Sequence, residues 1–578
     1  MAPTDQLQEV KIMLHGTAAS EGIGIGKVML IEEHSLEYTP RTVTDTEAES
    51  QRFKAAVDAF CYNTEKQAEN LRSSAGEKEA EILAGHIQII KDPYLSGEIE
   101  KLIADGQCAE SALEHMCDMF IAMFSAADDE LTKQRAADVR DIKSGVLGIL
   151  LGVNEIKVSD APKGTVLVAR ELTPSVTAGI VKENIAGIIT ETGGTTSHSA
   201  ILARALEIPA VLSVEGVASS LKNGDTVVVD GSEGAVIVNP DDNTVAEYSK
   251  KRDAFLAERK ELENYRGRET KSASGEAYEL VCNIGKPEDA VKAVDADGEG
   301  VGLFRTEFLF MDRTSIPTED EQFEAYKKAA LILKGKSLII RTLDIGGDKD
   351  IPYLGLEKEE NPFMGFRAIR YCLKNRELFK SQIKAILRAS AFGDIKIMFP
   401  LITTMDELRE GKKLVAECKA DLRNMGINFN ENIQVGVMVE TASAAVIADM
   451  LAKEADFFSI GTNDLTGYTM ACDRGNNDVS YLYSPLQPSV LRMIKRTIEC
   501  GVQNGISVGM CGEAAANKLM IPLLISFGLT EFSVSAPSVL NVRKIISTWT
   551  KEEADKVTAK VLEMSTQQEI VEYLKSVV

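Results

Sequence analysis

From residue 270 onward, short apolar runs alternate with helical segments, and this alternation limits the possible folds more than any other feature. The runs are continuously apolar, which is typical of strands buried on both faces. They are ELVCNI at 279–284, GVGLFR at 300–305, SLIIRT at 337–342, IKIMFP at 395–400, QVGVMVE at 434–440, DFFSIG at 456–461, SVGMCG at 507–512 and EFSVSA at 531–536. Eight such strands with intervening helices predict a (β/α)8 barrel, with a doubly wound open sheet as the alternative.

The first half of the chain has a different pattern. Residues 36–152 are rich in Glu, Lys, Ala and Leu, and their apolar residues recur at the three- and four-residue spacing of a helix. Strand-like runs lie on both sides of this block, at 22–32, 164–170, 187–190, 209–214, 226–231 and 235–240. The helical block is therefore expected to be inserted into a small α/β domain.

A chain of 578 residues is too long for one compact core, so we expect several domains. Residues 241–266 are charged and helical in pattern, and they are expected to connect the two halves. The predicted architecture is multidomain α/β, with five segments: 1–35 and 153–240 forming the α/β domain, 36–152 the helical subdomain, 241–266 a linker and 267–578 the barrel.

Charge and composition exclude several partners. The formal charge of −24 argues against binding to a nucleic acid backbone or to an anionic membrane. No apolar run is long enough for membrane insertion, and the N-terminus lacks the pattern of a secretory signal. Nine scattered cysteines without a CxxC pair fit a reducing compartment, so a cytoplasmic location is expected. An anion site in such an acidic chain must concentrate its arginines locally.

Arginines do follow the predicted strands. In a (β/α)8 barrel the active site is built at the C-terminal ends of the strands. Arg305 is the last residue of the second run, Arg341 is the last but one of the third, and Arg474 follows the sixth. Their guanidinium groups are suited to hold a phosphate or a carboxylate. Any one of them alone would more often be a surface ion-pair partner.

Acidic, amide and thiol groups also occur at these strand ends. Glu440 and Asp464, the latter beside Asn463, come from neighbouring strands and are expected to share one divalent cation, for which carboxylate oxygens favour Mg²⁺ over Zn²⁺. Cys511 is a candidate acid or nucleophile, with nearby cations expected to lower its pKa. The alternative for Cys511 is a small buried apolar residue. Asp344 and Lys349 lie in the loop after Arg341.

The stretch ETGGTTSHSAILAR at 191–204 places one of only five histidines in a turn of small polar residues before a helix. Backbone N–H groups of such a turn and helix start can surround a phosphoryl group, and a neutral imidazole can accept one. The alternative is that Ser197 or a neighbour only caps the helix and His198 lies on the surface. The chain lacks the G-x-x-x-x-G-K-[ST] loop of many nucleotide triphosphate sites.

Several long motifs resemble one family. They are GGTTSHSAILAR at 193–204, GVGLFRTEFLFMDR at 300–313, IIRTLDIGGDKD at 339–350, ENPFMGFRAIR at 360–370, GVMVET, FFSIGTNDLTGYTMACDRGN and GMCGE. Over essentially its whole length the chain resembles Enzyme I of the bacterial phosphoenolpyruvate-dependent sugar phosphotransferase system. The resemblance implies a swivelling phosphohistidine α/β domain, an HPr-binding helical subdomain, and a barrel that binds phosphoenolpyruvate and forms a homodimer.

The resemblance also implies roles for individual residues. His198 would take the phosphoryl group from phosphoenolpyruvate and pass it to the carrier protein HPr, and Thr177 would hydrogen-bond this histidine. Cys511 would donate the proton that converts the enolate into pyruvate. Four residues would hold the substrate, namely Arg305, Arg341, Asn463 and Arg474. Mg²⁺ would be carried by Glu440 and Asp464.

Two other functions use related scaffolds. A pyruvate phosphate dikinase or phosphoenolpyruvate synthase needs an ATP-grasp domain of several hundred residues, for which this chain has no room. A non-catalytic regulator is disfavoured because all candidate chemical groups are present. A nitrogen-related paralogue usually has an additional N-terminal sensory domain, so the sugar system is favoured.

Two motifs differ from the family pattern. Where many relatives read NDLTQYT this chain has Gly467, and it reads CGEAAA near the cysteine. Neither change removes a candidate chemical group.

Overall fold

The chain folds into two compact units, residues 1–259 and 260–578, and each is described by itself. The structure is a computed structural model. It describes residues 12–31, 36–74, 77–126, 130–153, 158–172, 176, 180–194, 197–311, 313–346, 351–474 and 476–578.

An eight-stranded mixed sheet organises the first unit, in the order β1-β8-β7-β3-β4-β5-β6-β2. The strands are β1 (Ile12–His15), β2 (Thr17–Ser20), β3 (Ile23–Ile31), β4 (Thr165–Ala169), β5 (Ile185–Thr190), β6 (Ala210–Leu212), β7 (Thr226–Asp230) and β8 (Ala235–Val238). The sequence analysis predicted all of them except β1 and β2. These two short strands meet at Gly16, where an added Cβ would lie 2.4 Å from the carbonyl oxygen of Leu212.

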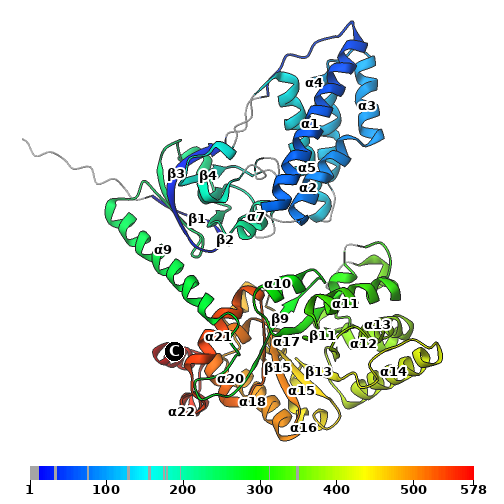
Figure 1. The fold of residues 1–578 in the computed structure, drawn as a ribbon, viewed down its shortest axis with the longest axis vertical. Coiled ribbons are helices and arrows are strands. Elements are labelled where there is room, and N and C mark those ends of the chain that lie inside the picture. The colour runs from blue at the N-terminus through cyan, green and yellow to red at the C-terminus, as the bar shows by residue number, and fades with distance from the viewer. Residues whose placement is uncertain are drawn as a thin grey trace, which may run out of the picture. The chain divides into compact units, whose positions relative to one another are not determined.

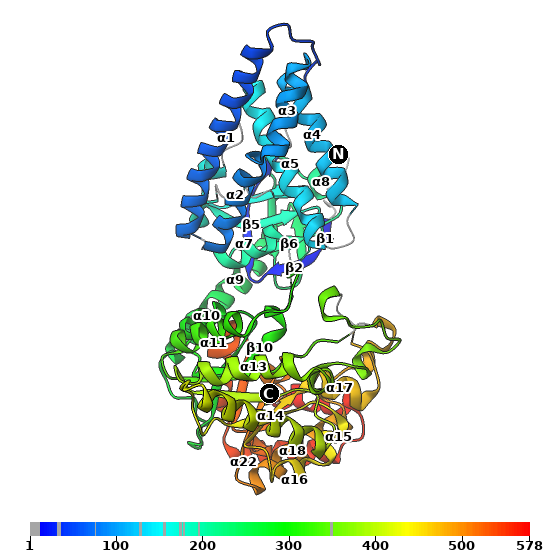
Figure 2. The same ribbon diagram turned by 90° about the vertical axis from the view of Figure 1, so that its right-hand side faces the viewer.

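Two helices of this unit pack on the sheet, α7 (His198–Leu206) and α8 (Val217–Ser220). Five more form a bundle, which Figure 1 and Figure 2 show apart from the sheet. The bundle has an apolar core of its own. Its helices are α1 (Thr46–Ser74), α2 (Glu77–Ile90), α3 (Pro93–Ala104), α4 (Ala109–Ser125) and α5 (Glu130–Leu151). In the chain the bundle lies between β3 and β4, which are parallel neighbours in the sheet. The helical insertion is therefore confirmed, although its first helix begins at Thr46 and not at residue 36.

Helix α9 (Asp242–Leu262) forms most of the predicted linker. Its buried residues are confined to its first two turns, where Tyr248 packs against Val228 and Ile237 of the sheet. The rest of the helix has no apolar stripe, which is typical of a solvated connecting helix.

The second unit is a closed barrel of eight parallel strands, so the open-sheet alternative is wrong. The strands are β9 (Glu279–Ile284), β10 (Gly300–Arg305), β11 (Ser337–Arg341), β12 (Ile395–Phe399), β13 (Val435–Val439), β14 (Phe457–Gly461), β15 (Ser507–Cys511) and β16 (Glu531–Val534). Each lies within its predicted run. Their outward side chains pack against the surrounding helices in one large apolar cluster.

Fourteen helices follow or connect these strands in the described part of the unit. They are α10 (Asp289–Asp295), α11 (Glu319–Leu333), α12 (Ala368–Lys374), α13 (Arg376–Ala389), α14 (Met405–Asn424), α15 (Ala442–Val446), α16 (Ala448–Leu451), α17 (Thr462–Met470), α18 (Pro488–Gln503), α19 (Glu513–Ala516), α20 (Ile521–Phe527), α21 (Val539–Thr548), α22 (Lys551–Glu563) and α23 (Gln567–Val577). Among all described residues of the chain, no helix has the length and apolar content needed to span a membrane.

Inward side chains fill the barrel. A second, smaller apolar cluster contains one residue from each of six neighbouring strands, namely Leu303, Ile339, Met398, Met438, Phe457 and Cys511. All eight strands run in the same direction, so their C-terminal ends form one mouth. Cys511 is the last residue of β15 and therefore lies inside the barrel near this mouth.

Candidate active site

Three carboxylates meet at the barrel mouth. Asp344, Glu440 and Asp464 each offer one oxygen, and these oxygens lie within 4.8 Å of one another. Asp344 lies in the loop after β11, Glu440 follows β13 directly, and Asp464 lies in the first turn of α17. The predicted pairing of Glu440 with Asp464 therefore holds geometrically, and the structure adds Asp344 as a third carboxylate.

The backbone of neighbouring strands holds Glu440 in place. The N–H of Leu401 donates a hydrogen bond of 2.7 Å to Glu440 Oε1. At Gly461, the end of β14, an added Cβ would lie 2.6 Å from Glu440 Oε2. The missing side chain at Gly461 thus leaves the space into which the carboxylate reaches.

Two buried arginines surround the acidic cluster. Arg341, the last residue of β11, contacts Glu307 at 2.7 Å and Asp344 at 2.9 Å. Arg367 contacts Asp344 at 2.7 Å and Asp464 at 3.2 Å. The sequence analysis assigned no role to Arg367 because it follows a long loop and not a strand. Its presence in the motif ENPFMGFRAIR was the one available signal.

The electrostatics of the cluster favour a bound cation. Burial raises the pKa of Glu440 to about 8, the charges of Asp464 and Asp344 add to this effect, and Arg341 and Arg367 oppose it. Burial also raises the pKa of Asp464, against the opposing charge of Arg367. Carboxylates that raise one another's pKa are stabilised when a divalent cation neutralises them. Three clustered oxygens fit Mg²⁺, which prefers oxygen ligands.

The other predicted substrate residues lie around the same mouth. Arg305 is the exposed last residue of β10, and its guanidinium lies over the ring of Phe308 at 5.2 Å. Arg474 is exposed in the loop after α17, and its charge lowers the pKa of Asp464. Asn463 lies in the first turn of α17, where its backbone carbonyl oxygen accepts a hydrogen bond of 3.0 Å from the hydroxyl of Tyr483. Asn463 and Asp464 therefore belong to a helix start and not to the strand itself.

Cys511 differs from its predicted state. Burial raises the pKa of its thiol to about 11, and the charges of Glu440 and Glu531 act in the same direction. The Ser459 hydroxyl lowers it, as does the charge of Arg341 by a smaller amount. The prediction that nearby cations lower this pKa is wrong, because burial penalises the thiolate more than one arginine stabilises it. The thiol is thus protonated near neutral pH, and it suits an acid better than a nucleophile.

His198 is the first residue of α7. Ser197 is the N-cap, and its hydroxyl accepts a hydrogen bond of 3.3 Å from the N–H of Ala200. The helix-cap interpretation of Ser197 is therefore correct, but it leaves other N–H groups of the first turn available to an anion. Gly193 has a φ of +104°, a conformation that favours glycine. Thr177 and Lys349 lie outside the described residues, as do Thr195 and Thr196 of the turn before His198.

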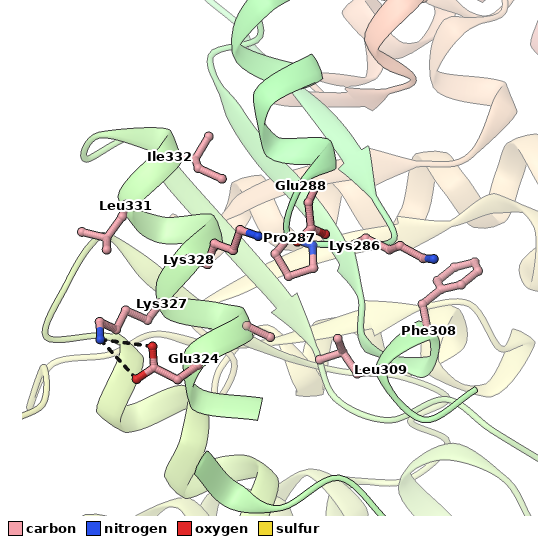
Figure 3. A pocket seen from close by; sticks show the side chains of 11 residues that line it. Lys286, Pro287, Glu288, Phe308, Leu309, Glu324, Lys327, Lys328, Leu331 and Ile332 are labelled. Atoms are coloured by element: carbon pink, nitrogen blue, oxygen red, sulfur yellow. Dashed lines mark hydrogen bonds and ion pairs between the residues drawn. The ribbon is translucent and has the colours of Figure 1, made fainter. Parts of the chain in front are cut away.

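A separate cavity of about 840 Å³ lies beside α11 and the segments that follow β9 and β10. Two of its lysines are paired with acids, Lys327 with Glu324 at 3.2 Å (Figure 3) and Lys328 with Glu288 at 2.5 Å. Because these acids offset the lysine charges, the cavity lacks the concentration of cationic groups found at the mouth. We therefore place the candidate active site at the mouth.

Known families and proteins match almost the whole chain. Models of the phosphoenolpyruvate-utilising enzymes match in three parts, the N-terminal domain at residues 15–135, the mobile domain at 161–234 and the phosphoenolpyruvate-binding domain at 259–550. The phosphoenolpyruvate-protein phosphotransferase of Bacillus subtilis is 46% identical over 570 residues, which cover 98% of this chain and 99% of that protein. The protein of the same name from Listeria innocua is 45% identical, covering 97% and 98%.

A solution structure of Enzyme I (nEIt) matches 42% of this chain and 99% of its own, with 37% identity and a TM-score of 0.38. The full-length identity to the two bacterial proteins is high enough to assign the family. This chain belongs to the phosphoenolpyruvate-protein phosphotransferases, the Enzyme I family of phosphoenolpyruvate-utilising enzymes.

Proposed function

We propose that this protein transfers the phosphoryl group of phosphoenolpyruvate to its own His198 and then to a histidine of HPr, with release of pyruvate. This reaction starts the sugar phosphotransferase system. The observation that carries the proposal is the meeting of Asp344, Glu440 and Asp464 with two buried arginines at the mouth of a barrel of this family. The test is incubation with phosphoenolpyruvate and Mg²⁺, followed by mapping of an acid-labile phosphoryl group.

The arginines are proposed to hold the substrate. Phosphoryl transfer depends on positioning and on neutralising the charge that is spread over the phosphoryl oxygens. Arg341 is fixed by ion pairs to Glu307 and Asp344, so its guanidinium is held in place before substrate binds. Arg305 and Arg474 are exposed and are free to close on the phosphate, with Asn463 assisting.

Asp344, Glu440 and Asp464 are proposed to hold Mg²⁺. When bound, the cation would polarise substrate oxygens and stabilise the negative charge of the enolate. Arg367 forms ion pairs with Asp344 and Asp464 and would keep both carboxylates oriented toward the cluster.

His198 and the arginines belong to different units, so transfer requires the histidine to reach the barrel mouth and then HPr. We propose that residues 241–266, mostly α9, act as the hinge, and that the 36–152 subdomain docks HPr. Thr177 is proposed to support the histidine by a hydrogen bond. The protein is further proposed to work in the cytoplasm as a homodimer joined through its barrel, residues 267–578.

Cys511 is proposed to protonate the enolate of pyruvate. Its Sγ–H bond breaks as a C–H bond forms at the methylene carbon, which gives pyruvate and leaves a thiolate. The thiol carries a proton to donate because its pKa is raised to about 11. Without substrate, the thiol donates a hydrogen bond to the carbonyl oxygen of Ile460, with 3.6 Å between Sγ and that oxygen.

Replacing Cys511 with alanine is expected to slow pyruvate formation about 10²- to 10⁴-fold, the usual contribution of a positioned proton donor. Phosphorylation of His198 in a single turnover is expected to continue, because the thiol does not take part in phosphoryl transfer. Rapid-quench measurement of phosphohistidine and of pyruvate separates the two steps. Cys472→Ala, in the loop after α17, is the matched control and should behave as wild type. Unchanged steady-state kinetics in Cys511→Ala would remove the proton-donor role.

The dikinase or synthase alternative is not supported. The bacterial relatives cover nearly the full length of this chain and leave no part of it for an ATP-grasp domain. Labelling of His198 from phosphoenolpyruvate, but not from ATP, is the expected result.

A further inference from the structure

Another carboxyl group lies inside the barrel, at the end opposite to the mouth. Glu531 is the first residue of β16 and is only 7% exposed. Among the described residues, its Oε1 has no hydrogen-bond partner. Burial raises the pKa of Glu531 to about 7, the charge of Glu279 on β9 adds to this effect, and Lys396 on β12 opposes it. Burying a carboxyl group with an unpaired oxygen lowers the stability of the folded state, so the presence of this group requires a reason.

The side chain of Glu531 lies over the neighbouring strand. Glu531 pairs with Gly509 of β15, and an added Cβ at Gly509 would lie 2.5 Å from Glu531 Oε1. The carboxyl therefore occupies the space that any other residue at position 509 would fill. Gly509 pairs on its other side with Ser459 of β14. Neighbouring strands are about 4.8 Å apart, so the carboxyl lies roughly one strand spacing from Ser459.

Ser459 connects this position to Cys511. Its hydroxyl is fully buried and forms no hydrogen bond of ordinary geometry with a described residue. The hydroxyl nevertheless lies close enough to the thiol to lower the pKa of Cys511. Cys511 follows Gly509 by two residues on β15 and thus shares its inward face. The charge of Glu531 also acts on the thiol and raises its pKa. The three groups therefore lie close together on the inside of the barrel, with Glu531 and Ser459 at the level of Gly509 and Cys511 two residues further along β15.

We propose that Glu531 supplies the proton that restores the Cys511 thiol after each turnover, through the hydroxyl of Ser459. The proposal rests on the proposed function, in which Cys511 gives its proton to the enolate and becomes a thiolate. The Ser459 hydroxyl then donates its proton to Sγ. The Glu531 side chain, about one strand spacing away, swings toward Ser459 and replaces that proton. The S–H bond is restored, Ser459 is unchanged, and Glu531 is left as a carboxylate.

Glu531 regains its proton from solvent at the bottom of the barrel. Glu279 pairs directly with Glu531 across β9 and β16 and is exposed, so solvent reaches the level of this pair. Protons thus enter from the end opposite to the mouth, where the substrate binds. The direction of transfer agrees with the acidities, because a carboxyl with a pKa of about 7 gives its proton to a thiolate whose acid has a pKa of about 11.

Glu531→Gln tests the proposal, since it keeps the size of the side chain and removes the transferable proton. We expect the first pyruvate per site to form at the wild-type rate and later turnovers to be slowed about 10-fold or more. The value of kcat/KM for phosphoenolpyruvate should stay unchanged, because it reports only the steps up to pyruvate release. Wild-type turnover should decline as pH rises through about 7, where Glu531 loses its proton, and this decline should disappear in Glu531→Gln. Stopped-flow detection of pyruvate gives both the first turnover and the steady state.

Ser459→Ala provides an independent variant and should also slow only the later turnovers. Asp394→Asn is the matched control, an exposed carboxyl just before β12 at the same end of the barrel, and should behave as wild type. If Glu531→Gln shows wild-type steady-state turnover and the wild-type pH profile, while Cys511→Ala is impaired, the role of Glu531 is wrong and that of Cys511 stands. If Cys511→Ala itself turns over normally, the proton-donor function fails instead. Equal slowing of the first and later turnovers in Glu531→Gln would indicate a structural role and would overturn the proposal.

Discussion

His198→Ala is expected to lose phosphoryl transfer to HPr and all acid-labile labelling by phosphoenolpyruvate, a decrease of at least about 10⁴-fold. The imidazole nitrogen is the proposed acceptor, and alanine offers no atom that can form the P–N bond. The fold should remain, because His198 is the first residue of α7 and the cap of that helix comes from Ser197. Labelling with ³²P-phosphoenolpyruvate followed by peptide mapping measures the loss directly.

His115→Ala is the matched control for this experiment. His115 lies in α4 of the helical bundle, and its replacement should leave labelling by phosphoenolpyruvate intact. Release of pyruvate in the presence of HPr by the His198→Ala protein would contradict the assignment. So would a label that maps to any other histidine in the wild-type chain.

Glu440→Gln is expected to weaken Mg²⁺ binding by at least about 10²-fold and to slow turnover by at least about 10³-fold. Glutamine keeps the size of the side chain and an oxygen that can accept the hydrogen bond from Leu401, so the local structure should survive. It removes one of the three charges that the cation would neutralise. Titration calorimetry with Mg²⁺ alone measures the binding, and steady-state pyruvate formation measures the turnover.

The pH dependence of Mg²⁺ binding provides a second measurement on the same variant. In the cation-free protein the pKa of Glu440 is raised to about 8, so below this pH the carboxyl is protonated and must lose its proton to bind the cation. Wild-type affinity should therefore increase as pH rises through 8, and this increase should be absent in Glu440→Gln. Asp406→Asn, an exposed carboxylate at the start of α14, is the control and should bind Mg²⁺ as wild type does. Equal affinity in wild type and Glu440→Gln would exclude Glu440 as a ligand.

The barrel was predictable from the sequence for a simple physical reason. Strands that are covered on both faces must be apolar at nearly every position, so each leaves a continuous run in the sequence. The ends of β10, β11 and β15 fall at Arg305, Arg341 and Cys511, as the runs predict. The two missed strands, β1 and β2, are four residues long and pair with β8 and β6 far along the chain. Such short segments carry too little periodicity to be distinguished from loops.

The acidic cluster was only partly predictable. Glu440 and Asp464 were expected to lie close together because neighbouring parallel strands end at the same edge. Asp344 and Arg367 come from a long segment between β11 and α12, and no strand pattern fixes where such a segment folds back. Ion pairs of Arg367 with Asp344 and Asp464 place them at the mouth, and these contacts exist only in the folded chain.

By itself, the sequence determined the eight strands, the inserted helices and most of the chemical groups, because local patterns of apolar and polar residues are sufficient for these. Only the tertiary structure decided the protonation of those groups. Burial inside the barrel, and not the neighbouring arginine, sets the direction of the pKa shift of Cys511. Closure of the barrel likewise buries the carboxyl of Glu531 over Gly509. In the sequence, nothing distinguishes this residue at the start of a strand. Burial is a property of the whole fold, so no local pattern reveals it.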